Sequence, residues 1–464
     1  MMPSSGLPRG RRLLKSKGKS KRNTSDSSDM RDDLVRRASA MTRVLRIACG
    51  VAVLVSASAA FGAEPGTLNV ESLIEEALAN NPGLDVLRHR LAATEALVPQ
   101  AGALRDPMFK LNLSNVPLSD FDFDSSPMSG KQFVLTQRLP YWGKRAVREE
   151  VAARDVGVVE AGLQDREGVI VNVVKQAYFT LIFIDRSIEL TEQNRSLLRD
   201  FIRIAQTKYA VGSGLQQDVL KAQVSLSSLN VRLIGLRQRR DRAAAELNTT
   251  LNRQPQALLG ATGELVPTPF VLDVESLQET ALESRPLLRG MRERGNRWRA
   301  VEKLAYSDSH RPDFVVSFGY TQRGFDDDPV EGSDFLSLGV ELNLPINRGS
   351  MHHHHVVEAR ARLRATEAEY EEKRQQVFLR IQQFSIDIAA HGDEAALYKT
   401  AIITQAEQAL SSAMAGYRVD KVDFLTLLDN QVTLLDFEIA YHHHRTEYEK
   451  SLAKLEAEVG KRLF

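Results

Sequence analysis

Histidine is the residue type whose clustering in this sequence most directly suggests chemistry. Seven of the ten histidines fall in two runs, His352 to His355 and His442 to His444, and imidazole is a common ligand of copper, zinc and nickel. Consecutive side chains on a helix diverge by about 100°, so a run offers at most an i, i+3 pair such as His352 and His355. Two ligands do not close a four-ligand site. We therefore expect transient metal binding at most, from solvated runs without a dedicated function.

No other constellation of residues in the sequence points to catalysis. The chain has no HExxH zinc motif, no phosphate-binding loop and no dinucleotide fingerprint. Its single cysteine, Cys49, lies in an N-terminal leader, so the exported chain offers neither a thiol nucleophile nor a disulfide. We expect a protein that is not an enzyme and that needs no cofactor.

The first 63 residues differ in composition from the rest. Residues 1–40 are rich in Ser, Lys and Arg, which predicts a disordered leader or a segment upstream of a true start at Met41. Residues 41–63 have the arginines, short apolar run and small residues of a secretory signal peptide. Of 61 Lys and Arg and 60 Asp and Glu, 13 and 4 lie in residues 1–63, which leaves 48 against 56, formally −8. That charge argues against a nucleic-acid partner.

The exported chain contains two similar halves, residues 64–260 and 261–464. The letters VESL at 70–73 recur at 274–277, and a Leu-Pro pair occurs at Leu139 and again at Leu344. Further landmarks repeat in the same order at an offset of about 200 residues. We expect each half to run helix, strand, loop, strand, very long helix, turn, helix.

Four segments alternate in the manner of strands, at about 109–116, 132–139, 314–322 and 335–344. In the last of them every second residue from Leu336 to Leu344 is apolar, which suits lipid on one face and water on the other. Four strands cannot close a barrel, and an open edge is not tolerated in hydrocarbon. Three copies of the chain would supply 12 strands. The alternative is a small soluble sheet packed on the helices.

Each Leu-Pro pair is followed by about 70 residues with apolar positions spaced three and four apart, such as Ile170, Leu181 and Ile184. This spacing predicts helices on the order of 100 Å long that pack as coiled coils. On such helices the two histidine runs would lie on the order of 65 Å apart and could not form one site. The fold class is therefore mainly α, with a helical coiled-coil barrel and a shared membrane β-barrel.

The residues in this layout resemble the outer-membrane factor family, the TolC-like exit ducts of efflux pumps. The resemblance rests on the two-fold repeat, the strand-Leu-Pro-helix junctions, and YAVGSGLQQDVLKAQVSL (209–226) with its partner YRVDKVDFLTLLDNQVTLL (417–435). It implies a homotrimer with a 12-stranded barrel in the outer-membrane lipid of a Gram-negative bacterium and a helical tunnel in the periplasm. It also implies two partners, a periplasmic adaptor and an inner-membrane transporter of the resistance-nodulation-division (RND) class.

The resemblance further implies where the site residues lie. The turns after the long helices would form the periplasmic tip, with the residues of the turn and of adaptor docking being Tyr209, Gly212, Gly214, Tyr417 and Val419. A closed aperture lined by acids would contain Asp218 and Asp429, which occupy the matching places in the two halves, with Asp423 and Asp420 on the second turn as substitutes. The second half departs from the family pattern, with Val422 in place of an arginine and Thr426 in place of an aspartate. For each acid singly, an ordinary helix-capping role is the alternative.

The cargo is open at this point. The segment VGSGLQQDVLKAQV (211–224) is similar to the corresponding segment of family members that serve heavy-metal pumps, of the copper/silver or the cobalt/zinc/cadmium type. The two histidine runs agree with a metal cargo. A duct for drugs or other organic solutes is one alternative. Others are a periplasmic coiled-coil adaptor and a soluble metal-binding protein of the periplasm.

Overall fold

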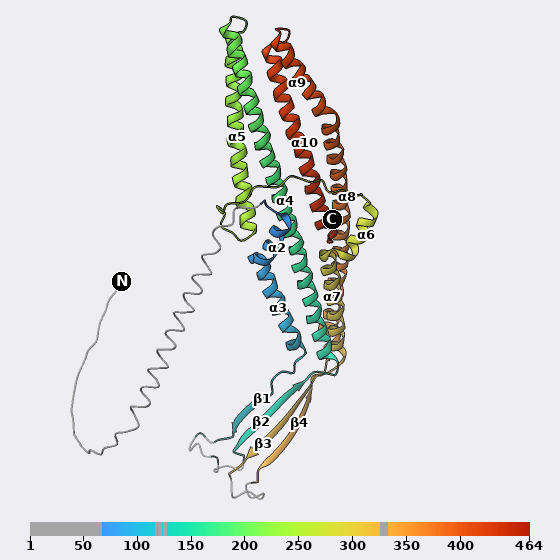
Figure 1. Ribbon diagram of the computed structural model, residues 1–464. Coiled ribbons are helices and arrows are strands. Elements are labelled where there is room, and N and C mark those ends of the chain that lie inside the picture. The colour runs from blue at the N-terminus through green and yellow to red at the C-terminus, as the bar shows by residue number, and fades with distance from the viewer. Residues whose placement is uncertain (1–66, 117, 119–122, 124–127, 325–332) are drawn as a thin grey trace, which may run out of the picture. The chain divides into compact units, whose positions relative to one another are not determined.

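The computed structural model describes residues 67–116, 118, 123, 128–324 and 333–464 (Figure 1). The expected leader (1–40) and signal peptide (41–63) lie outside the described residues. From Thr67 to Phe464 the chain forms one compact unit.

The two halves of this unit pass through the same order of elements. The first contains helices α2 (Val70–Asn80) and α3 (Pro82–Gly102), strands β1 (Met108–Ser114) and β2 (Gly130–Leu139), and helices α4 (Lys144–Ala210) and α5 (Gln216–Thr250). The second contains α6 (Val274–Ser284), α7 (Pro286–His310), β3 (Phe314–Gln322), β4 (Phe335–Leu342), the π-helix η1 (Arg348–His352), α8 (His353–Leu397), the π-helix η2 (Tyr398–Ile402), α9 (Ile403–Arg418) and α10 (Phe424–Val459).

This order confirms the predicted repeat, with one difference at the start of each half. Two helices precede the strands where one was expected, because Pro82 and Pro286 stand at the first positions of α3 and α7. A proline is favoured at the first position of a helix, whereas inside a helix it removes a backbone hydrogen bond. The second long helix also differs from the expectation of an unbroken helix, since the π-helix η2 interrupts it between α8 and α9.

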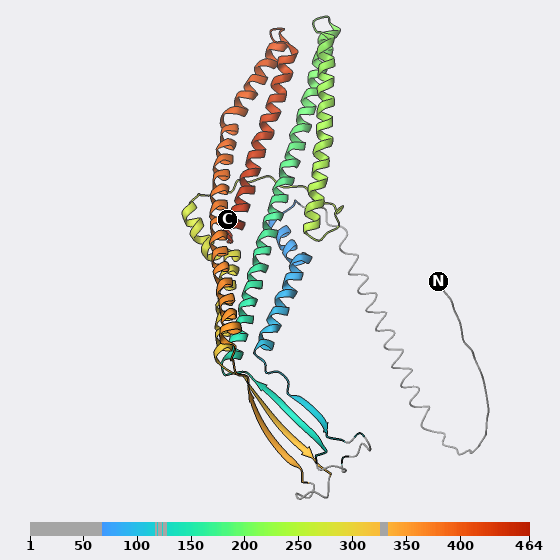
Figure 2. The same ribbon diagram turned by 180° about the vertical axis from the view of Figure 1, so that it is seen from behind.

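The long helices pack in pairs, α4 with α5 and α8 with α10, and α4 also contacts α10 (Figures 1 and 2). Ile170, Leu181 and Ile184 of α4 are buried in one core with residues of α2, α3 and α5, as their spacing predicts. Val173 is three residues after Ile170 and continues the same apolar spacing, but it is 43% exposed and lies outside this core. Part of α4 is long and apolar enough by composition to cross a membrane, and 33% of that stretch is buried inside the structure.

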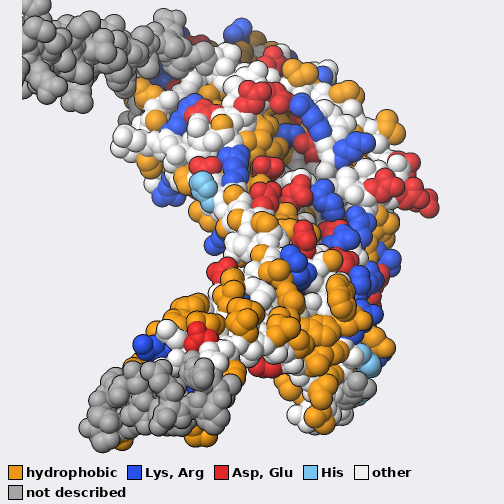
Figure 3. All heavy atoms as spheres, turned by 90° about the horizontal axis from the view of Figure 1, so that it is seen from below, with side chains coloured by type: hydrophobic (Ala, Val, Ile, Leu, Met, Phe, Trp, Pro, Cys, Tyr) orange, Lys and Arg blue, Asp and Glu red, His pale blue; other side chains and the backbone are white. Residues whose placement is uncertain are grey.

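The four strands form one antiparallel sheet in the order β1-β2-β3-β4. Their register aligns Phe109, Leu135, Phe318 and Leu338 in one row across the sheet. These side chains are 48–76% exposed, while the opposite face has rows such as Thr136, Ser317 and Gly339. Figure 3, viewed from the end where the sheet lies, shows hydrophobic side chains gathered there and charged ones over the helices. The two-faced character predicted for β4 therefore holds for the whole sheet.

The sheet does not pack on the helices, so the alternative of a small soluble sheet lying against them is wrong. Among the described residues the strands make substantial contact only with one another. The link to the helices is a junction centred on Lys144, which is 2% exposed. Its Nζ lies 2.8 Å from Asp313 Oδ1 and 2.9 Å from Asp308 Oδ1, and it donates to the carbonyl oxygen of Arg311 at 2.8 Å.

Candidate functional site at the helical tip

Two turns lie side by side at the end of the helices opposite the sheet (Figures 1 and 2). One joins α4 to α5 at residues 211–215, and the other joins α9 to α10 at residues 419–423. A shared core lies behind both turns. Its buried members include Phe201 of α4, Ala222 of α5 and Phe424 of α10. Because this core joins all four helices, the two turns form one tip.

The backbone of each turn requires an unusual conformation. Gly212 has a φ of +77°, a conformation that glycine adopts without strain. Gly214 does not have a positive φ; its role is close approach, because a Cβ there would lie 2.9 Å from Lys208 Cβ. The second turn lacks glycine, and Asp420 itself takes a φ of +61°, which is uncommon for a residue with a side chain. Both turns reverse the direction of the chain through a residue with a positive φ, which is a glycine in the first turn and an aspartate in the second.

Lys208, near the end of α4, reaches across to the second turn. Its Nζ donates a hydrogen bond of 2.6 Å to the carbonyl oxygen of Tyr417, pairs with the carboxylate of Asp420, and lies 4.7 Å from the centroid of the Tyr417 ring. The Lys208 side chain is 13% exposed and that of Asp420 is 64% exposed. The sequence does not reveal this contact, because nothing in the spacing of Lys208 indicates which helix it faces.

Asp218 and Asp423 are electrostatic neighbours at the N-terminal ends of α5 and α10. Asp423 caps α10 by accepting a hydrogen bond of 2.9 Å from Thr426 N, and hydrogen bonding by Thr426 lowers the pKa of the Asp423 carboxyl. Burial raises the pKa of Asp218, and the charge of Asp423 raises it further, against the effects of a backbone hydrogen bond at Leu215 and of Lys221. Asp423 therefore acts as the N-cap of α10. The carboxyl of Asp218 is protonated at a higher pH than that of an ordinary aspartate.

The remaining expected tip residues are dispersed. Asp429 is exposed on α10, two turns beyond Asp423, and makes no ion pair with the described residues. Tyr209 and Val419 are 49% and 62% exposed. Tyr417 is 6% exposed, its ring packs edge-on against Phe424 at 5.4 Å, and its hydroxyl has no hydrogen-bond partner among the described residues. Tyr417 thus lies beneath the tip surface, where it supports the turn.

The histidine runs differ from each other in their surroundings. His352 and His355 lie near Asp308 and Glu358 at the sheet end of the helices, and His355 Nδ1 is 3.7 Å from Glu358 Oε2. In the second run the expectation of solvated side chains is wrong for two of the three. Arg186 Nε donates to His442 Nε2 at 3.2 Å, and burial with the charge of Arg186 lowers the pKa of His442 to about 4. His444 is half-buried between α8 and α10.

Comparison with known proteins gives the family. The sequence model of the family described as outer membrane efflux protein matches residues 73–253 and 277–461. The cobalt-zinc-cadmium resistance protein CzcC of Cupriavidus metallidurans is 24% identical over 379 residues, which is 81% of this chain and 86% of that protein.

Solved structures share the fold. The outer membrane protein VceC of Vibrio cholerae matches with a TM-score of 0.71 and 20% identity, over 84% of this chain and 96% of VceC. CusC, described in terms of transmembrane channel formation, matches with a TM-score of 0.72 and 16% identity, over 87% of this chain and 96% of CusC. The agreement extends over both helices and strands, since it covers most of each chain.

Proposed function

Because the chain belongs to the outer membrane efflux protein family, and is thus an outer-membrane efflux channel rather than an enzyme or an adaptor, we propose that it is the passive exit duct of a tripartite pump. Three copies form the duct, which runs from the periplasm through the outer membrane. The observation that carries this proposal is the four-stranded sheet with one predominantly apolar face and two open edges, β1 and β4.

The sheet has the properties of one third of a membrane barrel. An open edge in hydrocarbon leaves backbone groups without partners, and pairing β4 of one copy with β1 of the next removes every edge. Three copies give 12 strands, and their apolar rows would face lipid. At the helix end of the sheet, Trp142 is 77% exposed and its ring lies 5.7 Å from that of Phe314. Exposed tryptophan is enriched at the membrane–water interface.

The helices carry a second surface that suits a further copy of the chain. Leu220, Val224, Val231 and Ile234 lie on one side of α5 and are 53–70% exposed. Their spacing of three, four and seven residues is that of a coiled-coil seam. In a trimer this stripe would pack on the neighbouring subunit, so that the helices enclose a tunnel below the barrel.

The tip is the part of the duct that would meet a periplasmic adaptor and, through it, an inner-membrane transporter of the RND class. Tyr209 and Val419 are exposed there, and Gly212 and Gly214 shape the first turn. Three-fold repetition would set Asp218, Asp420, Asp423 and Asp429 in rings, which concentrate negative potential at a constriction and favour cations.

We further propose that the cargo is a heavy-metal cation of the cobalt, zinc and cadmium group. The support is the likeness to CzcC, a cobalt-zinc-cadmium resistance protein, together with the acidic tip. The test is deletion of the gene in its own host, followed by growth in graded Co²⁺, Zn²⁺ and Cd²⁺ and in organic dyes and detergents. We expect the deletion to lower tolerance of the cations. Loss of tolerance to the organic compounds alone would overturn the metal cargo.

The duct itself has a separate test. The purified chain, reconstituted in planar lipid bilayers, should be a trimer that conducts ions. A monomer that stays in solution without detergent and gives no current would overturn the proposal.

A further inference from the structure

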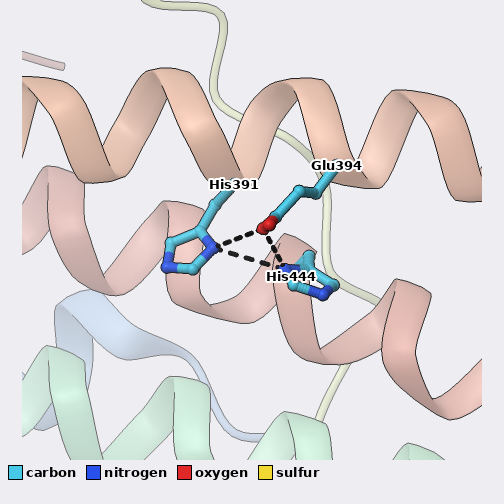
Figure 4. Close-up of side chains that lie close together, drawn as sticks. All are labelled: His391, Glu394 and His444. Atoms are coloured by element: carbon cyan, nitrogen blue, oxygen red, sulfur yellow. Dashed lines mark hydrogen bonds and ion pairs between the residues drawn. The ribbon is translucent and has the colours of Figure 1, made fainter.

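Three side chains from two helices converge near the C-terminal end of α8, where it faces α10 (Figure 4). His391 and Glu394 are one turn apart on α8, and His444 faces them from α10. Glu394 Oε2 lies 3.2 Å from His391 Nδ1 and 2.6 Å from His444 Nδ1, and the two nitrogens are 3.3 Å apart. From these distances we propose that His391, Glu394 and His444 form a binding site for a borderline divalent cation of the Zn²⁺ or Co²⁺ type.

The distances are those of a partly formed tetrahedral site. Around an ion with bonds of about 2.0–2.1 Å, neighbouring tetrahedral ligand atoms are about 3.3 Å apart. Two of the three separations already have this value. The third, between Glu394 Oε2 and His444 Nδ1, must widen by about 0.7 Å to reach it. Rotation about the Glu394 side chain, which is 48% exposed, provides that movement.

The donor set also selects the class of ion. Two imidazole nitrogens and one carboxylate oxygen suit zinc and its neighbours, whereas calcium and magnesium prefer oxygen alone. The side chains of His391 and His444 are 26% and 19% exposed, so one side of the group is open to water. An ion could enter from that side, and a water molecule would take the fourth position, as in other three-ligand zinc sites.

The surroundings hold the ligands in this arrangement. The ring of Tyr398 stacks on that of His444 with centroids 5.4 Å apart and planes inclined by 19°. Tyr398 is also the first residue of η2. A bound ion would therefore join α8 to α10 four residues before the point where the second long helix passes through its π-helical turn. The site would fix the spacing of this helix pair in each subunit.

The site is independent of the identity of the cargo. It rests on side-chain geometry within one chain, and it holds equally for a duct that exports organic solutes. The two proposals therefore fail separately: absence of metal binding here leaves the duct intact, and an organic cargo leaves this site intact.

The test uses the purified, full-length exported trimer in detergent, stripped with a chelator and titrated with CoCl₂ and then with ZnCl₂. Tetrahedral Co²⁺ gives intense visible absorption, so the geometry and the stoichiometry are read together. We expect one ion per chain, displaced by Zn²⁺, and at least a tenfold loss of affinity in His391→Ala and in Glu394→Gln. The second variant keeps the size of the side chain and so guards against misfolding. Chromatography should show both variants as trimers.

The matched control is His354→Ala, which removes an exposed histidine of the other run and should leave binding unchanged. Two outcomes overturn the proposal. One is a wild-type protein that binds no more Co²⁺ than His391→Ala. The other is binding that is lost in His354→Ala and kept in His391→Ala, because the ion would then sit in the first histidine run.

Discussion

The ammonium group of Lys208 lies 2.6 Å from the carbonyl oxygen of Tyr417, and this bond joins the two turns of the tip. Lys208 belongs to the first half of the chain and Tyr417 to the second. The same ammonium group pairs with Asp420, so one side chain of α4 holds both the end of α9 and the turn that follows it. We expect this contact to hold the tip in a closed conformation.

Replacing Lys208 should open the tip. A hydrogen bond from a charged group contributes about 1.5–3 kcal/mol, so Lys208→Met should raise the ratio of open to closed states about tenfold or more. Asp420→Asn should have a smaller effect, below about 1 kcal/mol, because the Asp420 carboxylate is largely exposed. The measurement is single-channel conductance in planar bilayers. Arg203→Gln, which removes an exposed i, i+3 pair with Asp200 on the same helix, is the control and should behave as wild type.

Protonation of Asp218 should reduce cation selectivity on mild acidification. An ordinary aspartate is protonated near pH 3.9. Because the pKa of Asp218 is raised, its carboxyl gains a proton at a higher pH than that as the solution is acidified. The reversal potential in a KCl gradient should therefore move toward zero above that pH. Asp218→Asn should be less selective at neutral pH and should lack this early change. A wild-type curve that stays flat down to about pH 4 would argue against Asp218 as a lining residue.

Asp429 provides a separate test of the acidic rings. Asp429→Asn should lower cation selectivity at neutral pH, because three carboxylates leave the proposed constriction together. It should keep the pH dependence that comes from Asp218. Asp200→Asn removes an acid that is already paired with Arg203, and serves as the control for a general loss of negative charge. Equal effects of Asp429→Asn and Asp200→Asn would remove Asp429 from the site.

Much of the fold follows from the sequence, because periodicity is a local signal. The alternation from Phe314 to Gln322 gave the bounds of β3, and the two-fold repeat gave the order of the elements. The apolar face of β1 and β2 was less clear from sequence. It becomes evident only through register, which aligns Phe109 and Leu135 with Phe318.

The site was less predictable, because its contacts join residues far apart in the chain. Lys208 meets Asp420 across 212 positions, and His391 meets His444 across 53. The histidine runs point to imidazole, but the two partners of His444 on α8, Glu394 at 2.6 Å and His391 at 3.3 Å, lie outside both runs. The one local signal was the spacing of His391 and Glu394, which places both on one face of a helix.

The junction between sheet and helices should be sensitive to Lys144. This side chain is almost fully buried. It forms ion pairs with Asp313 and Asp308 and donates a hydrogen bond to the carbonyl oxygen of Arg311. Removal of one partner from a fully buried ion pair costs about 3–5 kcal/mol. The carboxylates of Asp313 and Asp308 are 22% and 43% exposed, so Lys144→Met should cost less than that, but it should still lower the unfolding temperature of the trimer, followed by circular dichroism. Lys303→Met, at an exposed pair with Glu150, should change it little. Equal unfolding temperatures for the two variants would show that the junction does not depend on Lys144.

The exposed stripe on α5 should be the contact between subunits. Val231 is 69% exposed at the middle of the stripe, and in a trimer it would be buried against a neighbouring chain. Val231→Asp would then place an unpaired charge in an apolar seam, at a cost of several kcal/mol per subunit, and should shift the protein from trimer to monomer. Light scattering coupled to size-exclusion chromatography in detergent measures this shift. Asn230→Asp introduces the same charge at the adjacent exposed position, off the stripe, and should remain trimeric. A Val231→Asp protein as trimeric as Asn230→Asp would mean that the subunits meet through another face of the helices.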